Sequence, residues 1–487
     1  MMKKIIAWVL AACVLLGLLT AMQINPERLS DTSVFVDDTP VDQQALYEEL
    51  FDLNSTVQID VNLSKDEIAK IQEDYQYYKA MNSKSPIYRR AASVTFTING
   101  QKYVIEDVGI RMKGNSTRSN FYNDVLGIYN IVHFKLHFGQ TFESGKYYSL
   151  DAQDWPDEDA RQERLHRTFA TLEKMELKWN SIADNTYMRT TYMHEMFRDF
   201  DVPAQRCVPV DFRIGGCRMG VYRLYEPVDE TFIHRCFPKK DWGGDLYKVR
   251  CTDDSPANYT PVNTYGINSK NNAEFYNFDL KTNQETSQHE SMKHLLEVIN
   301  KPDVTKEELG AVVDTDSFAR FNAINFAAGN QDDLRFNYNN HYVYFRKSDG
   351  KAVFIPYDCE VCLGDTYSWN PSGDALTGVS PYEERTFRDD SQSNALVRQT
   401  VLEGGCYTDL YTDCLRDICQ SKWLTEDHFR SYYDTAASHY ADRVISPYSF
   451  MSTMRMDTSF TMESRNGNLA IGEFMEKMRE NLTQYVN

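Results

Sequence analysis

Three short turns that contain glycine constrain the fold of this chain more than any other feature of its sequence. Asn99-Gly100, Gly215-Gly216 and Asp349-Gly350 each separate two segments of alternating or apolar residues. Turns of this composition favour the tight reversal that joins two antiparallel strands. The sequence therefore predicts three β-hairpins and a substantial amount of antiparallel sheet.

Most of the predicted strands lie in the first half of the chain. Their side chains alternate between apolar and polar, as expected for strands with one buried face. The predicted strands are 57–61, 93–98, 101–112, 132–138, 208–214 and 218–225, with 341–346 and 351–355 following later. We expect a mostly antiparallel N-terminal sheet.

Helical patterns are interleaved with these strands. Ser64-x-x-Glu67 is a capping box that opens a predicted helix to about Tyr78. Residues spaced with a helical period predict further helices at 160–178, 185–200, 288–300 and 315–329, and a largely helical chain after about residue 391. There is no regular alternation of strand and helix, so the predicted fold class is α+β.

The N-terminus carries an export signal. Lys3 and Lys4 precede an uncharged run, 5–22, which is long for a secretory signal and short for a membrane span. Residues 1–22 are therefore a signal peptide or a membrane anchor, with a lipoprotein site at Cys13 as a third reading. We expect a secreted or extracytoplasmic protein that contacts a membrane only through this segment. Residues 23–55 are polar and read as a linker, with folding from about residue 56.

Charge and cysteine content exclude several functions. The chain has 52 basic and 71 acidic residues, a net charge of −19, which disfavours nucleic acid as a partner. Nine cysteines follow Cys13, an odd number that favours buried thiols with one or two disulfides. Cys359-x-x-Cys362 has no second cysteine pair to complete a zinc site. His194-Glu195 lacks the second histidine of a zinc protease, because Arg198 stands there.

The densest group of candidate functional residues lies between Asn330 and Asp365. Acids and amides precede the predicted hairpin 341–355, and Asp358 and Glu360 follow it. Two such segments can bring hard oxygen ligands together, the kind that Mg²⁺ and Mn²⁺ prefer. The alternative is an ordinary acidic turn exposed to solvent.

Five blocks in order carry a resemblance to a known family. They are Val-Gly-Ile-Arg-Met-Lys-Gly-Asn-Ser at 108–116, Gly-Val-Tyr-Arg-Leu-Tyr-Glu-Pro-Val-Asp at 220–229, Leu-Tyr-Lys at 246–248, the block from Asn330, and Ile-Pro-Tyr-Asp-Cys-Glu at 355–360. In this order, the chain from about residue 56 to 440 resembles the CotH family of spore coat protein H kinases. Tyr357 and Glu360 replace a Trp and an Asp of the family pattern, and Ile131 replaces the first lysine of a block that retains Lys135.

The resemblance implies an atypical protein-kinase-like fold of two lobes within residues 56–487. The N-lobe would span about 56–245 and the C-lobe about 276–487, with a surface insertion at about 252–275. The implied activity is transfer of the γ-phosphate of ATP, with Mg²⁺ or Mn²⁺, to Ser or Thr of secreted, coat or surface proteins.

Residue roles follow from the same resemblance together with the chemistry of phosphoryl transfer, which requires positioning and charge neutralisation. Asp332 would orient the acceptor hydroxyl, with Asp333 as its competitor. The metal candidates are Asp358, Asn340 (with Asn337 as rival) and Glu360. The candidates for the nucleotide are Lys113, Lys135, Lys248, Arg111 and Glu226, the last to hold a lysine or a metal. Gly109, Gly114 and residues 115–117 would form a loop whose N–H groups face phosphates.

Two other functions fit the same residues. One is a catalytically inactive kinase-like adhesin or structural coat protein. The other is a different ATP-dependent transferase that modifies proteins. Under the kinase reading, Asp358→Ala should abolish phosphate transfer and leave the melting temperature near that of the wild type, because a loop acid contributes little to packing.

Overall fold

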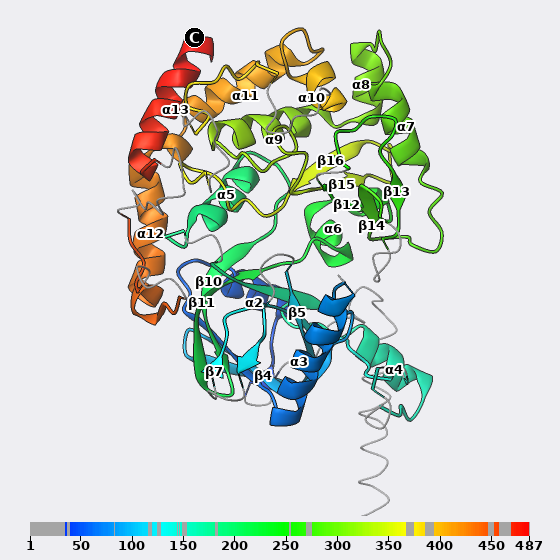
Figure 1. The fold of residues 1–487 in the computed structure, drawn as a ribbon, viewed down its shortest axis with the longest axis vertical. Helices are drawn as coiled ribbons and strands as arrows, with labels where there is room; N and C mark the ends of the chain where they lie inside the picture. Colours follow the sequence, from blue (N-terminus) through cyan, green and yellow to red (C-terminus); the bar gives the residue numbers. More distant parts are fainter. Residues whose placement is uncertain are drawn as a thin grey trace, which may run out of the picture.

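The computed structural model has a barrel at one end and a helical region with a second sheet at the other (Figure 1). It describes residues 35–36, 39–81, 83–114, 119–123, 128–143, 145, 147–148, 153–180, 184–252, 255–268, 275–366, 375–384, 394–446, 452–456 and 469–486. The apolar run 5–22, Cys13 and residues 115–117 lie outside these ranges. Among the helices that are described, none is long and apolar enough to cross a membrane.

Seven strands in the order β10-β11-β9-β8-β5-β4-β3 close the barrel. Their bounds are β3 Val57–Asn62, β4 Arg89–Ile98, β5 Gln101–Lys113, β8 His133–His137, β9 Lys174–Trp179, β10 Cys207–Ile214 and β11 Cys217–Tyr225. All neighbours pair antiparallel except β10 and β3, whose parallel pairing closes the ring. Closure removes the exposed strand edges that an open sheet would leave.

The first two predicted hairpins of the barrel are confirmed. Ile98 pairs with Gln101 across Asn99-Gly100, where both turn residues have positive φ, 48° and 87°. Gly215 and Gly216 have φ of 56° and 77° between β10 and β11. Two successive residues with positive φ match the right-handed twist of the strands they join.

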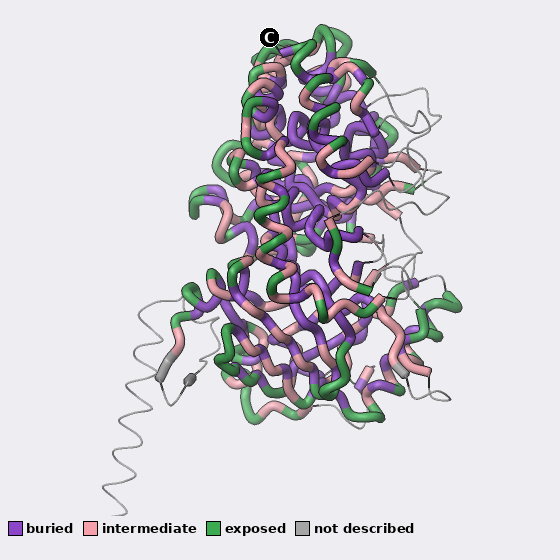
Figure 2. The backbone as a smooth tube through the Cα atoms, turned by 90° about the vertical axis from the view of Figure 1, so that its left-hand side faces the viewer, coloured by how far each residue is buried: buried purple, intermediate pink, exposed green. Residues whose placement is uncertain are grey.

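The barrel interior is apolar because alternate side chains of each strand point inward. Phe134 and Leu136 of β8 and Leu177 of β9 are fully buried there, with Tyr222 and Leu224 of β11. Figure 2 shows buried residues concentrated inside both ends of the molecule, with exposed residues on the outside. The opposite face of these same strands carries the charged residues described below.

The prediction that residues 23–55 form a linker is wrong for its last part. Helix α2, Gln43–Leu50, begins at the N-cap Asp42, whose carboxylate accepts the N–H of Gln44 and Ala45. Leu46, Tyr47 and Leu50 are buried in the barrel cluster. These apolar residues occur at helical spacing among polar neighbours. The segment was read as a linker from its polar composition, although the spacing of its apolar residues indicated an amphipathic helix.

Helix α3, Lys65–Ala80, begins where the capping box predicted. The Ser64 hydroxyl accepts the N–H of Glu67 at 3.2 Å. The Glu67 carboxylate accepts from Lys70 and from the backbone of Arg90, so it ties the helix to β4.

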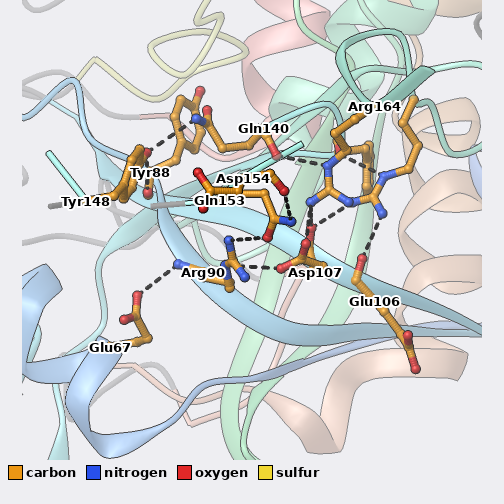
Figure 3. A network of polar contacts seen from close by, with 12 residues as sticks. Glu67, Tyr88, Arg90, Glu106, Asp107, Gln140, Tyr148, Gln153, Asp154 and Arg164 are labelled. Atoms are coloured by element: carbon orange, nitrogen blue, oxygen red, sulfur yellow. Dashed lines mark hydrogen bonds and ion pairs between the residues drawn. The ribbon is translucent and has the colours of Figure 1, made fainter. Parts of the chain in front are cut away.

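The helix predicted over 160–178 is a shorter helix followed by a strand. Helix α4, Glu158–Leu165, ends before β9 begins at Lys174. Arg164 fixes α4 against β5: its Nε donates to the carbonyl of Gln140 at 2.9 Å, and its guanidinium also contacts Asp107 (Figure 3). Arg90 reaches Asp107 from β4 at 3.2 Å. The helical pattern failed because Lys-Met-Glu-Leu-Lys-Trp alternates with period two, and the strand is selected by its neighbours β8 and β11.

The second sheet has five strands in the order β13-β14-β12-β15-β16. Their bounds are β12 Leu246–Val249, β13 Tyr265–Gly266, β14 Phe278–Leu280, β15 His341–Phe345 and β16 Ala352–Pro356. The third predicted hairpin, β15 with β16, is confirmed, and every residue of both strands is buried. The surface insertion predicted at 252–275 is only partly at the surface: residues 257–260 are buried, whereas Val262 is 80% exposed. Tyr259 is fully buried, with its hydroxyl 2.7 Å from His341 Nε2.

Helices pack around this second sheet and fill the upper part of Figure 1. They are α5 Arg189–Asp199, α6 Glu230–Cys236, α7 Glu290–Ile299, α8 Lys306–Val312, α9 Thr315–Ala327, α10 Ala395–Thr400, α11 Thr408–Gln420, α12 Glu426–Tyr440 and α13 Ile471–Val486. Of these, α12 extends down beside the barrel strand β10. Three short 3₁₀ turns lie at Lys239–Asp241, Lys422–Leu424 and Ala441–Arg443. The remaining elements among the described residues are two pairs of two-residue strands: β1 Phe35–Val36 with β2 Thr39–Pro40, and β6 Tyr122–Asn123 with β7 Ile128–Tyr129.

The α+β class and the largely helical chain after residue 391 are confirmed. The N-terminal sheet is also mostly antiparallel, but it closes into a barrel that the sequence did not predict. The expected disulfides are absent, since all nine cysteines after Cys13 lie in the described ranges and are free thiols.

Candidate active site

One row of side chains crosses the outer face of the barrel. The strand registers place Arg111, Lys135, Glu176 and Tyr225 directly beside one another on β5, β8, β9 and β11. The residues two positions along are also on this face, because side chains alternate along a strand. They are Lys113, His133, Lys178 and Arg223. The register therefore gathers charge from four strands that are distant in sequence.

Glu176 holds two lysines. Its carboxylate pairs with Lys113 through Oε2 and with Lys135 through Oε1, the latter at 3.2 Å. Burial would raise the pKa of Glu176, but the neighbouring ammonium groups of Lys113, Lys135 and Lys178 outweigh it and hold that pKa well below its usual range. Glu176 is therefore an anion at every physiological pH.

Lys178 joins the barrel to the loop after β16. Its Nζ lies 2.8 Å from Asp358 Oδ1, and the ammonium stands over the rings of Tyr225 and Tyr357, 4.7 and 4.5 Å from their centroids. Burial would lower the pKa of Lys178, but Asp358 together with Tyr225, Glu360 and Glu176 outweighs this and raises it. For Asp358, burial acts to raise the pKa, and Lys178 together with Lys113 and Lys248 reverses this to a net lowering.

Arg223 makes a parallel connection to the same loop. Its guanidinium pairs with the carboxylate of Glu360 and donates to Thr190 Oγ1 at 2.7 Å. Burial raises the pKa of Glu360 even though Arg223 opposes the shift.

Lys248 reaches the cluster from β12 of the second sheet. Its ammonium lies 3.8 Å from the centroid of the Tyr357 ring, and among the described residues it forms no ion pair with a carboxylate. Burial, reinforced by Lys113, lowers the pKa of Lys248 well below its usual range. Burial likewise lowers the pKa of Lys113 to about 8, because Glu176 only partly offsets it.

We call the residues Lys113, Lys135, Lys178, Lys248, Glu176 and Asp358 the lysine cluster. It contains four buried amines and only two carboxylates, so the amines outnumber the anions that could pair with them. Uncompensated buried charge is costly, and it shifts pKa values in the direction seen for Lys113 and Lys248. The cluster is therefore suited to an anion.

Asp332 lies within the electrostatic reach of Asp358, which acts to raise its pKa. Three asparagine amides donate to its carboxylate: Asn337 at 2.5 Å, Asn339 at 3.2 Å and Asn340 at 2.7 Å. Burial is the largest influence and raises the pKa of Asp332 to about 7, against the opposing amides. A backbone hydrogen bond also joins the two segments that carry these acids, because the Tyr357 N–H donates to the Asn340 carbonyl at 2.9 Å.

Asp333, the sequence competitor of Asp332, has a different environment. Its Oδ1 accepts the backbone N–H groups of Arg335 and Phe336, at 2.9 and 2.8 Å. It is buried, and burial raises its pKa to about 7. This geometry stabilises the loop turn and turns the carboxylate inward, so Asp332 is the better placed of the two acids.

Glu226 does not join the lysines, contrary to the sequence expectation. Its carboxylate accepts from the Tyr47 hydroxyl at 3.0 Å and pairs with Arg235 of α6. Both partners belong to elements that the motif did not include, and Tyr47 lies in the α2 segment that was expected to be unfolded. The acid that holds the lysines is Glu176 instead.

Arg111 lies beside Lys135 but faces away from the carboxylates. Its guanidinium stands over the Tyr88 ring at 5.1 Å and donates to the carbonyl of Ser85 at 3.3 Å. Gly109 lies within β5, and a Cβ there would meet Gln140, so its small size serves packing. Gly114 follows the strand with φ of 109°, and the rest of the expected phosphate loop lies outside the described residues.

Comparison with known proteins gives a match over the part of the chain that contains these residues. A family model described as CotH kinase protein matches residues 110–465, well over half of the chain. The chain belongs to the CotH kinase family. The family resemblance inferred from the five blocks is thereby confirmed. A search of curated proteins finds no match to the chain.

The CotH match begins inside β5. Strands β3 and β4 and helices α2 and α3 therefore precede it, yet β3 closes the barrel against β10. All the residues of the lysine cluster, together with Asp332, fall inside the match.

Sequence reasoning missed Glu176, Lys178 and Arg223 in this CotH protein. Glu176 and Lys178 were assigned to the helix predicted over 160–178. Nothing in that assignment placed them on the same sheet face as Lys135. The period-two alternation of 174–179 was the signal that could have found them. Arg223 stood within a quoted block, but only the barrel register shows that it neighbours Lys178.

The fit of a divalent cation differs among the three candidate ligands. Asp358 offers a carboxylate that is one third exposed, and Asn340 offers its amide oxygen because its amide nitrogen donates to Asp332. Glu360 does not fit, because Arg223 pairs with its carboxylate and the side chain is only 12% exposed. Among the described residues, no three His, Cys, Asp or Glu side chains are grouped to hold a metal.

Proposed function

We propose that this CotH family member is an ATP-dependent protein kinase that phosphorylates Ser or Thr of secreted, coat or surface proteins. The observation that carries the proposal is the excess of buried amines over carboxylates in the lysine cluster, near Asp332. A triphosphate is the anion that would neutralise several ammonium groups at once. In this proposal the barrel is the nucleotide-binding lobe of a two-lobed kinase, and the helical part with the second sheet is the other lobe.

The lysines would supply the electrostatic part of catalysis. Phosphoryl transfer leaves little covalent chemistry to the protein, so fixed charges aimed at the phosphate oxygens account for most of the acceleration. Lys113 and Lys135 are held in place by Glu176. Among the residues that the structure describes, Lys248 has no carboxylate partner that a phosphate would need to displace. Such preorganised donors need little rearrangement during the reaction.

Asp332 would orient the acceptor hydroxyl and take its proton. Its three asparagine donors fix the orientation of the carboxylate. A pKa of about 7 lets the group be ionised before the reaction and accept a proton during it. Asp333 is turned inward and lacks this freedom.

Asp358 and Asn340 are the residues that would hold Mg²⁺ or Mn²⁺. When bound, the ion would supply charge neutralisation to the phosphates. The N-terminal run 5–22 supports a secreted or extracytoplasmic location, with or without a membrane anchor.

The test uses the purified protein with ATP labelled on its γ-phosphate, Mg²⁺ or Mn²⁺, and a mixture of secreted proteins as acceptors. We expect labelled Ser or Thr, lost in Asp332→Asn and in Lys113→Met. Lys102→Met is the matched control, because Lys102 lies on the same strand but is exposed. Absence of any nucleotide binding would overturn the proposal and favour the inactive adhesin. An acceptor that gains the mass of a nucleotide would favour the other transferase.

A further inference from the structure

The acid Asp358, proposed above as a metal ligand, already has a cationic partner from the chain itself. Lys178 Nζ lies 2.8 Å from Asp358 Oδ1, and the Lys178 side chain is only 4% exposed. The barrel register fixes this side chain, since Lys178 on β9 pairs with Arg223 on β11 and lies two residues from Glu176. The contact is therefore part of the folded barrel and not a chance surface pairing.

Two aromatic rings complete the surroundings of the Lys178 ammonium. Tyr225 of β11 and Tyr357 beside Asp358 present their faces to it at 4.7 and 4.5 Å. Aromatic faces stabilise a buried cation, and the effect grows as water is removed. One carboxylate and two rings together form a built site for a single positive charge.

The second acid of this loop repeats the arrangement. Glu360 pairs with Arg223, whose side chain is 1% exposed. Both acids after β16 thus receive a fixed organic cation from adjacent positions on β9 and β11. A divalent cation at Asp358 would have to lie close to the Lys178 ammonium on the same carboxylate, and like charges at that separation repel strongly.

On the basis of the proposed function, we infer that Lys178 is a resident counter-cation and acts as a positioning residue. It takes over part of the charge neutralisation that a divalent cation supplies in nucleotide binding. The nucleotide phosphates would then meet an ammonium held by Asp358 together with Lys113, Lys135 and Lys248. ATP binding by this protein would depend only weakly on Mg²⁺ or Mn²⁺, and metal affinity at Asp358 would be suppressed.

The first arm of the test measures Mn²⁺ binding to the full chain without nucleotide, by electron paramagnetic resonance. Lys178→Met removes the cation and leaves Asp358, one third exposed, free to bind metal. We expect Lys178→Met to bind Mn²⁺ at least about tenfold more tightly than the wild type. Lys178→Arg should bind like the wild type, because it keeps the charge. Lys174→Met is the matched control, since Lys174 lies on the same face of β9 but pairs with the half-exposed Glu173.

The second arm measures ATP binding by calorimetry, in EDTA and in Mg²⁺. The wild type should bind ATP in EDTA within a few-fold of its affinity in Mg²⁺. In Lys178→Met, chelation of the metal should cost at least about tenfold in affinity. Circular dichroism verifies that each variant is folded.

The outcomes separate the two proposals. Equal Mn²⁺ affinity in the wild type and folded Lys178→Met would overturn the counter-cation, as would ATP binding that is lost from the wild type in EDTA. Failure of every variant to bind ATP in either buffer would overturn the proposed kinase function. The Mn²⁺ arm would still decide the role of Lys178 in that case.

Discussion

The Asp358 side chain follows β16 at a backbone position with φ of 54°, and it neutralises the buried ammonium of Lys178 at 2.8 Å. From the sequence alone, a loop acid of this kind was expected to contribute little to stability. The structure changes that expectation, because removing one partner of a buried ion pair leaves the other charge without compensation.

We therefore expect Asp358→Ala to be destabilised as well as inactive. The loss should be about 2–3 kcal/mol, below the usual cost of breaking a buried pair because Asp358 itself is one third exposed. Asp358→Asn keeps a polar contact to Lys178 and should lose less. Urea unfolding of both variants measures the difference, and an unchanged unfolding midpoint for Asp358→Ala would contradict the ion pair.

A second residue, Lys113, gives the protein a pH dependence. Its pKa is lowered by burial to about 8 from the usual 10.5. Between these two values the unfolded chain holds the proton and the folded protein has released it, so the contribution of Lys113 to stability increases as pH rises through this window. The neutral amine no longer attracts phosphate.

ATP affinity should accordingly fall as pH rises above about 8, by up to about tenfold per pH unit from this group. Titration of ATP binding between pH 7 and 9.5 measures the profile. Lys113→Met should bind more weakly at pH 7 and lose this dependence, while Lys102→Met should follow the wild type. A flat wild-type profile would exclude Lys113 from phosphate binding.

Among the elements, β9 determines whether the site exists. Its inward residues fill the barrel, and its outward residues Glu176 and Lys178 connect two strands of the barrel to the loop after β16. A single strand thus links core packing to the electrostatics of the cluster.

Glu176→Gln should destabilise the protein by about 3 kcal/mol or more, because it leaves Lys113 and Lys135 buried without their shared anion. Added inorganic phosphate should restore part of the melting temperature by taking the place of the carboxylate. Glu173→Gln, at a more exposed neighbouring position, is the control. An unaltered melting temperature in Glu176→Gln would show that the lysines are solvated rather than paired.

On the scale of the whole molecule, the folded unit begins earlier than the sequence indicated. Helix α2 buries Leu46, Tyr47 and Leu50 in the barrel, and Tyr47 also donates to the buried Glu226. The α2 side of both contacts lies outside the residues that match the CotH family model, whereas Glu226 lies inside them.

A protein that starts at Thr56 should therefore be poorly soluble or melt at a much lower temperature, because the barrel cluster loses three large apolar side chains. One that starts at Pro40 keeps α2 with its N-cap and should melt like the full chain. Differential scanning calorimetry of the two truncations decides this. Equal melting temperatures would mean that α2 is dispensable.

The hairpins, the α3 cap and the α+β class could be predicted from sequence because turn, cap and alternation signals are local. Asn99-Gly100 adopts positive φ at both positions, and Ser64 caps its own helix. Asp332, Asp358, Lys113 and Lys135 could be named because ordered motifs contain them. Glu176 and Lys178 could not, because their importance arises from neighbours on other strands.

Local sequence patterns were enough to establish which segments reverse direction, which faces are apolar and which family the chain belongs to, since those properties depend on residues close together in the chain. The closure of the barrel by β3 and β10, the pairing of Glu226 with Arg235 and the contact of Lys178 with Asp358 became known only from the folded molecule. These contacts join residues far apart in sequence, so they are fixed by strand register and burial and leave no local pattern to read.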